Sequence, residues 1–182
     1  ESRKAELEEL ILALAAPYQQ ELAILQTAPG IRSDFTAIGI ISEIGTNMEA
    51  FPSAKHLCSW AGLTPTNNES AGKKKSVRVS KAGCYIKPLL VQCANAVVAS
   101  KKHPEIRNRY LRLKKRRGHK KAIIAIARML LTALYHMLKN GENYNAELYR
   151  KYDLPPVDRE ITVEQAIIIA RNQGYKIKSA TA

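Results

Sequence analysis

The spacing of apolar residues along the chain predicts a protein built mainly from helices. Near the N-terminus, leucine and isoleucine recur every three or four positions among acidic residues, which places them on one face of a helix. Pro17 interrupts this pattern, which then resumes, and further helical patterns follow. The expected helices cover residues 3–16, 18–26, 34–44, 51–60, 85–100, 104–117, 120–138 and 162–172.

Two neighbouring helices differ in the surfaces they present. The helix expected at 120–138 is apolar almost all the way round, which predicts a position at the centre of the core. It is short for a membrane span and contains Arg128 and His136, so a buried helix is the better interpretation. The helix expected at 104–117 carries arginine and lysine along its length and must be largely exposed.

The segment Pro29-Gly30-Ile31 joins the second and third helices. Backbone amides at the start of a helix bind phosphate, and a glycine lets the turn approach it closely. The pattern resembles a helix-hairpin-helix motif, in which Gly30 and Ile31 would contact nucleic acid. An ordinary helix–turn–helix corner is the alternative interpretation.

A long polar connection follows, at residues 63–83, where alternating Val77 and Val79 permit a short strand or hairpin. A connection of this length inside a compact domain is usually functional or disordered. We therefore expect a mainly α fold: a helical domain containing a helix-hairpin-helix and a long basic loop, with room for a short β-hairpin. The expected divisions are a linker helix from an upstream domain at 1–24, a central domain at 25–138 and a helical extension at 139–182.

Positive charge is concentrated in the middle of the chain. The net charge is +13, and residues 73–121 hold 17 of the 29 lysines and arginines but only one acidic residue, Glu105. Such a block repels itself unless a polyanion covers it, so nucleic acid is the expected partner. A membrane surface is disfavoured because part of the charge lies in a glycine-containing loop rather than on an amphipathic helix.

The loop at 67–75 places a hydroxyl group beside three lysines. Ser70 is followed by the small residues Ala71 and Gly72. A nucleophilic oxygen, a flexible backbone and cations that neutralise charge on phosphate oxygens are the components of phosphodiester chemistry. On its own the pattern also suits a solvated serine, and Glu69 is poorly placed to act as its general base.

Cysteine and histidine usage does not indicate a metal centre. The three cysteines lack CxxC spacing and are odd in number, so reduced thiols are expected rather than disulfides or a zinc site. The four histidines are scattered. The chain begins at Glu1 with no signal or transit peptide, so we expect a cytoplasmic fragment of a larger protein, with no membrane partner.

Several sequence blocks, taken in order, are similar to one known domain. They are Pro29-Gly30-Ile31, Ile41-Ser-Glu43-Ile44-Gly45, Phe51-Pro-Ser-Ala-Lys-His-Leu57, Trp60-Ala-Gly62-Leu63-Thr-Pro65, Ser70-Ala-Gly72, Val79-Ser-Lys81-Ala-Gly83 and the basic stretch at 110–122. Together they resemble the C-terminal transposase domain of the bacterial insertion-sequence families 110, 116 and 902, over about residues 25–138.

The resemblance implies a reaction and a set of partners. A serine of this domain attacks DNA to form a covalent phosphoserine intermediate, and the matching position is Ser70, with Ser76 and Ser80 as alternatives. Ser59 lies on an expected helix and is given a structural role. Family members are similar to serine recombinases in function and assemble as oligomers around a structured guide RNA. DNA, guide RNA and further copies of the chain are thus the expected partners.

The family also has an N-terminal RuvC-like domain whose acidic tetrad binds Mg²⁺. No strand-rich stretch with spaced acids precedes residue 25, so we expect no cofactor or metal site within this chain. On this basis the isolated chain should bind nucleic acid without cleaving it, while the full-length protein acts as a transposase or recombinase.

Two positions depart from the family pattern. A Ser-Gly pair appears here as Ser70-Ala71-Gly72, which shifts the register by a residue, and Lys87 stands where the family often has arginine. Lysine keeps the charge but loses bidentate phosphate geometry. The cations expected to contact nucleic acid are Lys73, Lys74, Lys75, Arg78, Lys81, Lys87, Arg112, Lys114, Lys115, Arg116, Arg117, Lys120 and Lys121. The alternative function is a non-catalytic helix-hairpin-helix module that binds DNA or RNA.

Overall fold

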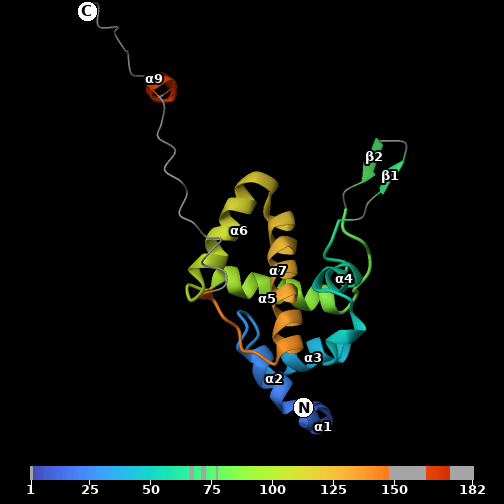
Figure 1. Ribbon diagram of the computed structural model, residues 1–182. Helices are drawn as coiled ribbons and strands as arrows, with labels where there is room; N and C mark the ends of the chain where they lie inside the picture. The colour runs from blue at the N-terminus through green and yellow to red at the C-terminus, as the bar shows by residue number, and fades with distance from the viewer. Residues whose placement is uncertain (1, 66–67, 71–72, 77, 148–162, 173–182) are drawn as a thin grey trace, which may run out of the picture.

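The computed structural model describes residues 2–65, 68–70, 73–76, 78–147 and 163–172. These residues form a mainly helical protein, as the apolar spacing predicts (Figure 1). The helices are α1 Ser2–Ala15, α2 Gln19–Gln26, α3 Asp34–Ile44, α4 Ala54–Trp60, α5 Ile86–Ala99, α6 Pro104–Arg117, α7 His119–Asn140 and α9 Val163–Asn172, with short 3-10 turns at Ala16–Tyr18 and Met48–Ala50.

The helix boundaries follow local signals in the sequence. Proline at position 17 marks the 3-10 turn between α1 and α2, where a regular helix cannot continue. The hydroxyl of Ser53 accepts a hydrogen bond from the amide of His56 and caps the start of α4. Pro104 occupies the first turn of α6, where its missing amide costs nothing. The predicted capping residue of the last helix, Thr162, lies outside the described residues.

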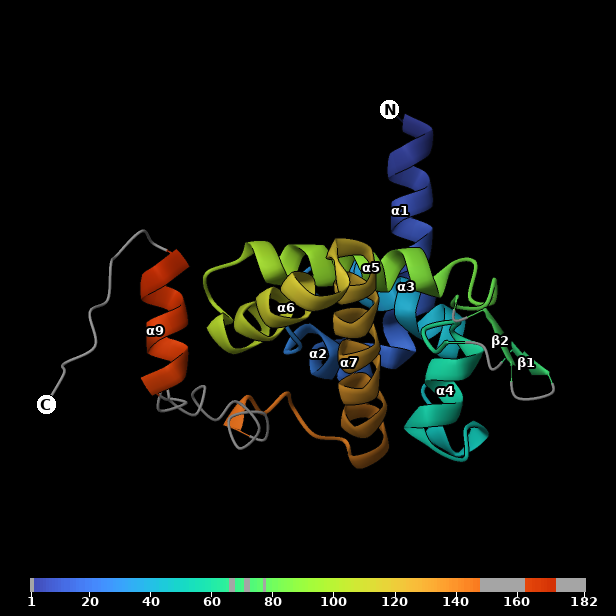
Figure 2. The same ribbon diagram turned by 90° about the horizontal axis from the view of Figure 1, so that it is seen from above.

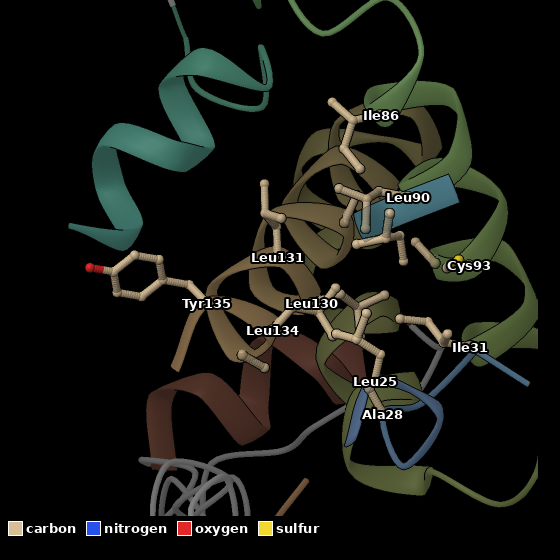
Figure 3. Close-up of a cluster of buried hydrophobic side chains, with 14 of the residues drawn as sticks. Leu25, Ala28, Ile31, Ile86, Leu90, Cys93, Leu130, Leu131, Leu134 and Tyr135 are labelled. Atoms are coloured by element: carbon tan, nitrogen blue, oxygen red, sulfur yellow. The ribbon is translucent and has the colours of Figure 1, made fainter. Parts of the chain in front are cut away.

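Helix α7 is the centre of the core, which confirms the prediction from its apolar surface. It packs against α2, α4, α5 and α6. Figure 3 shows side chains of α7, of α5 and of the end of α2 gathered in one apolar cluster, in which Leu25, Leu130 and Leu134 are fully buried. At its edge, the Tyr135 hydroxyl donates a 3.1 Å hydrogen bond to the carbonyl of Phe51 and so joins α7 to the segment before α4.

Helix α7 also passes the length and composition test for a membrane span. In the structure, however, 56% of its most apolar window is buried against the rest of the protein. That degree of burial is typical of the central helix of a folded core.

The connection between α4 and α5 contains a two-stranded antiparallel hairpin. Strand β1 covers Asn68–Ser70 and β2 covers Lys73–Ser76, with Ser70 opposite Lys73 and a register irregularity after Asn68. An isolated bridge between Pro65 and Val79 closes the base of the hairpin. A hairpin was permitted by the sequence, but its strands precede the alternating valines: Val79 lies in the bridge and Val77 lies outside the described residues.

Two segments stand away from the core. Figure 2 shows α1 projecting from the bundle, and Leu7, Leu10 and Leu14 on it are each more than half exposed. On another side, both views show the hairpin extending beyond α4.

Candidate nucleic-acid interface

The end of α6 and the start of α7 form a sharply turned, strongly basic corner. We use the name basic corner for its six exposed cations, Lys114, Lys115, Arg116, Arg117, Lys120 and Lys121. Gly118 makes the turn with φ +81°, a conformation that residues with a side chain rarely adopt. A Cβ at this position would meet no atom within 4 Å, so the glycine is required by its backbone conformation and not by crowding.

The basic corner is held by a polar contact between its two helices. The Tyr110 hydroxyl of α6 lies 2.8 Å from Nδ1 of His119, the first residue of α7. The two rings meet edge to face with centroids 6.0 Å apart, and the ammonium of Lys114 lies 5.9 Å from the Tyr110 ring centre. Because Tyr110 is itself 8% exposed, the corner is anchored to the core at the point where its charge is greatest.

No acidic side chain neutralises the basic corner within the described part of the chain. The ion pairs found there join Lys4 to Glu8 on α1 and His103 to Glu105 at the start of α6. The corner therefore presents uncompensated positive charge to solvent, an arrangement that favours a polyanionic partner. Arg112, one turn earlier on α6, is also exposed and extends this basic surface.

The base of the hairpin is fixed by two closely opposed turns. A Cβ added to Gly62 would collide with the carbonyl oxygen of Ala82, and one added to Gly83 would collide with that of Ala61. Both glycines have positive φ, at +65° for Gly62 and +67° for Gly83, so each is needed for conformation as well as for space. These turns bring the end of α4 into contact with the segment that leads from the hairpin into α5.

Lys87 lies within this junction. Its Nζ donates a 2.6 Å hydrogen bond to the carbonyl oxygen of Ser80 and would lie 2.7 Å from a Cβ at Gly62. The side chain is half-buried, and the ammonium is directed to the main chain of the hairpin base. Its predicted contact with nucleic acid stays a prediction, and the structure gives it a second role in holding the junction.

The three candidate serines occupy different environments. Ser70 is the last residue of β1, directly before the tip of the hairpin, and Ser76 ends β2 opposite Asn68. Ser80 follows the hairpin, and its hydroxyl accepts a 3.3 Å hydrogen bond from the amide of Ala82. Ser80 is thus engaged in the turn, whereas Ser70 lies near the tip of the projecting hairpin, with Lys73 opposite.

The remaining predicted cations fall into two regions. Lys73, Lys74 and Lys75 lie on β2, while Arg78 and Lys81 are exposed after it. Figure 1 shows the hairpin and the basic corner rising from the same side of the core, and Figure 2 shows them well apart when seen from above. The fold therefore brings the predicted residues together as two separate basic surfaces.

The turn between α2 and α3 is packed inside the protein. Gly30 has φ +85°, and a Cβ there would lie 2.5 Å from the carbonyl oxygen of Cys93 on α5. The side chain of Ile31 is fully buried, and its amide donates to the carbonyl of Ala28. Packing against the core therefore accounts for the presence of both Gly30 and Ile31. The Ile31 side chain does not reach solvent, and the predicted contact of this turn with a phosphate stays a prediction.

The cysteines are free thiols in three different settings. Cys84 is exposed in the segment before α5, whereas Cys58 and Cys93 are buried. Burial raises the pKa of Cys93 to about 11. Among the residues that the structure describes, no three histidine, cysteine, aspartate or glutamate side chains are grouped as metal ligands would be.

Three features were not found from the sequence. They are the Tyr110–His119 contact, the Lys87 contact with the hairpin base and the exposed ring of Tyr85, which is 74% accessible at the start of α5. Gly62 and Gly83, which flank the connection between α4 and α5, were the available sequence signal for the junction at the hairpin base. Glycine is favoured where two backbones approach closely. The aromatic contacts carried no comparable signal.

Comparison with known proteins places these features in a family context. Residues 22–111 match the model of the transposase IS116/IS110/IS902 family. The chain is also 29% identical over 127 residues to a protein of Streptomyces coelicolor described as "Insertion element IS110 uncharacterized 43.6 kDa protein", an alignment that covers 69% of this chain and 30% of that protein. No solved structure matches the chain.

The matched residues include most of α2, all of α3 to α5 with the hairpin, and the first half of α6. The matching family model is that of a transposase, and the relative is described as a protein of an insertion element. Over the matched residues, just under half of its length, the chain is similar to the IS116/IS110/IS902 family. The chain spans about a third of the length of the relative from Streptomyces coelicolor.

Proposed function

We propose that this chain is the DNA-binding and catalytic-serine part of an insertion-sequence transposase, with Ser70 as the nucleophile. The observation that carries the proposal is the family match at 22–111, which includes the hairpin and the basic residues Arg78 and Lys81 that follow it. We assign the matched segment to the C-terminal transposase domain of the family. DNA recombination is therefore the process in which the full-length protein acts.

The structure supports the proposal through the placement of charge. Ser70 is near the tip of a hairpin whose second strand is rich in lysine, so cations and the hydroxyl are carried on one projecting element. The basic corner lies elsewhere on the same side of the core. We assign the hairpin to the reacting phosphate and the corner to backbone phosphates at a distance from it.

The proposed step is a transesterification. The Oγ atom of Ser70 loses its proton and forms a bond to phosphorus, while the bond from phosphorus to one bridging oxygen of the DNA backbone breaks and that oxygen takes up a proton. A hydroxyl of another DNA strand then attacks the phosphoserine, rejoins the backbone and releases the serine. The number of phosphodiester bonds is conserved, so no external energy source is required.

Transposition by the full-length protein tests the assignment. Ser70→Ala is expected to abolish transposition and to leave nucleic-acid affinity nearly unchanged, because only the nucleophilic oxygen is removed. Ser59→Ala, at an exposed position on α4, is the matched control and should transpose normally. Unchanged transposition by Ser70→Ala would remove Ser70 from the mechanism, and Ser76→Ala and Ser80→Ala would then identify the alternative.

A non-catalytic nucleic-acid-binding module is the second candidate. It is favoured by the basic corner, which lies on two core-anchored helices and needs no contribution from Ser70. The two candidates differ in the Ser70→Ala result above. For the isolated chain we propose binding without cleavage, and strand cleavage of cognate DNA by the chain alone with Mg²⁺ would contradict this.

Finer properties of the family extend the proposal. We propose that the full-length protein has a RuvC-like domain that holds Mg²⁺, assembles as a homo-oligomer and uses a structured guide RNA. The helix-hairpin-helix assignment of α2 and α3 belongs to the same set. Competition between duplex DNA and structured RNA for this chain would show which of them the basic corner prefers.

A further inference from the structure

A shallow groove lies between α3 and the first turns of α5, at the foot of the hairpin. Its volume is about 570 Å³, and its walls come from both helices. The two helices lie close together here: a Cβ added at Gly39 would be 3.1 Å from a methyl carbon of Leu89. Figures 1 and 2 both show α3 running beside the start of α5. The groove belongs neither to the basic corner nor to the hairpin itself.

An exposed aromatic ring forms one wall of this groove. Tyr85 is 74% accessible, whereas Trp60, another exposed aromatic residue, packs against Phe51 with ring centres 5.7 Å apart. Among the ring contacts and cation–π contacts found in the described chain, none involves Tyr85. Its ring face is therefore free to stack on a flat ligand, the usual way in which proteins hold unpaired bases.

The polar groups of the groove select against phosphate and for a hydrogen-bond donor. Glu43 is half-buried on α3, and its side chain supplies carboxylate oxygens that accept hydrogen bonds. Gln92 on α5 can both donate and accept, and the hydroxyl of Ser42 already donates to the carbonyl of Gly39. A carboxylate repels phosphate but pairs with the exocyclic amino group of a base.

The segment beside the groove supplies the opposite charge. Lys81 is exposed before it, and the Lys87 ammonium is fixed at the hairpin base. The arrangement places cations outside the groove and a carboxylate inside it. A nucleotide can match both charges if its phosphate lies toward the lysines and its base lies on Tyr85, beside the carboxylate of Glu43.

We propose that this groove holds a single unstacked nucleobase that carries an exocyclic amino group, from a single-stranded stretch of nucleic acid. Tyr85 stacks on the base, and Glu43 accepts a hydrogen bond from its amino group. The proposal rests on the nucleic-acid binding proposed above, and it adds a base-selective site to that function. Cytosine, adenine and guanine carry such a group and fit the site, whereas thymine and uracil, which lack it, fit less well.

The test measures the affinity of the 182-residue chain for short single strands of one base and for a duplex of equal charge, by fluorescence anisotropy. Cytosine strands should bind more tightly than thymine strands at the same ionic strength. Tyr85→Ala should weaken cytosine binding by about tenfold, the scale of one base stacked on an aromatic ring, and should leave duplex binding unchanged. Tyr85→Trp should retain the affinity.

Two further variants separate stacking from other effects. Glu43→Gln should narrow the preference for cytosine over thymine, because an amide can also donate to the thymine carbonyl. Tyr18→Ala removes another exposed tyrosine, 42% accessible in the 3-10 turn between α1 and α2, and should leave the affinity for cytosine strands unchanged. Parallel DNA and RNA strands identify the source of the base, and a Tyr85 effect with either supports the site.

The outcomes are distinct. If Tyr85→Ala binds cytosine strands as tightly as the unaltered chain, or loses duplex and single-strand affinity equally, the base site is refuted while nucleic-acid binding stands. If the unaltered chain binds neither duplex nor single strands, the proposed function and the base site both fail.

Discussion

Replacing the four cations at the end of α6 with glutamine should flatten the salt dependence of duplex binding. The four residues are Lys114, Lys115, Arg116 and Arg117. All of them are exposed, and none forms an ion pair among those found in the described chain. If DNA lies on the basic corner, these side chains replace counterions on its phosphates.

The size of the effect follows from helix geometry. Successive residues of an α-helix are about 100° apart. Since Ile106 and Tyr110 mark the core side of α6, Lys115 points away from the core while Lys114 and Arg116 lie on opposite flanks. One duplex cannot contact both flanks, so two or three of the four cations meet phosphate. At about 0.9 per phosphate, the slope of log affinity against log salt should fall by about 1.8 to 2.7.

The assay is anisotropy of a labelled duplex over a series of salt concentrations. The control removes four exposed cations outside the basic corner, at Arg3, Lys55, Lys139 and Arg171, and so has the same net charge. Its slope should stay close to that of the unaltered chain. Equal slopes for the corner variant and the control would place the basic corner outside the binding surface.

Three other predictions concern the packing around the candidate site. Gly30→Ala should lower the free energy of unfolding by about 2 kcal/mol more than Gly118→Ala, measured by urea denaturation, because both have positive φ but only Gly30 is crowded; equal losses would contradict the packing role. Tyr110→Phe should cost about 1 kcal/mol in the same assay by removing the hydrogen bond across the basic corner, and no loss would make that bond unimportant. Cys84 should react with a thiol reagent in the folded protein. Cys93, whose pKa is raised by burial to about 11, should stay protonated and should react only as the pH nears that value or as the protein unfolds. Labelling of Cys93 as early as that of Cys84 would refute its burial.

The helical part of the fold could be predicted from the sequence because its signals are local. Periodic leucines, Pro104 and Gly118 fixed the boundaries of α6 to the residue, and the apolar surface of α7 identified the central helix. Such signals act within a few turns of chain and need no knowledge of tertiary contacts.

The site was less predictable because its contacts depend on the tertiary fold and not on local sequence spacing. Gly30 carries the same glycine signal whether it faces a phosphate or a neighbouring helix, and only its approach to Cys93 distinguishes them. Likewise, a lysine at position 87 gives charge but not direction, which the hydrogen bond to Ser80 supplies. The hairpin strands formed before the alternating valines, because pairing across a turn and not alternation alone determines which residues form the ladder.

The most direct test of the central claim is detection of the covalent intermediate in the full-length protein. Reaction with a DNA substrate whose cleaved strand cannot rejoin should trap a protein–DNA adduct that survives denaturation, and mass spectrometry should map the phosphate to Ser70. The adduct should be missing for Ser70→Ala and present for Ser59→Ala. Mapping to another residue, or no adduct under conditions where transposition proceeds, would contradict the account.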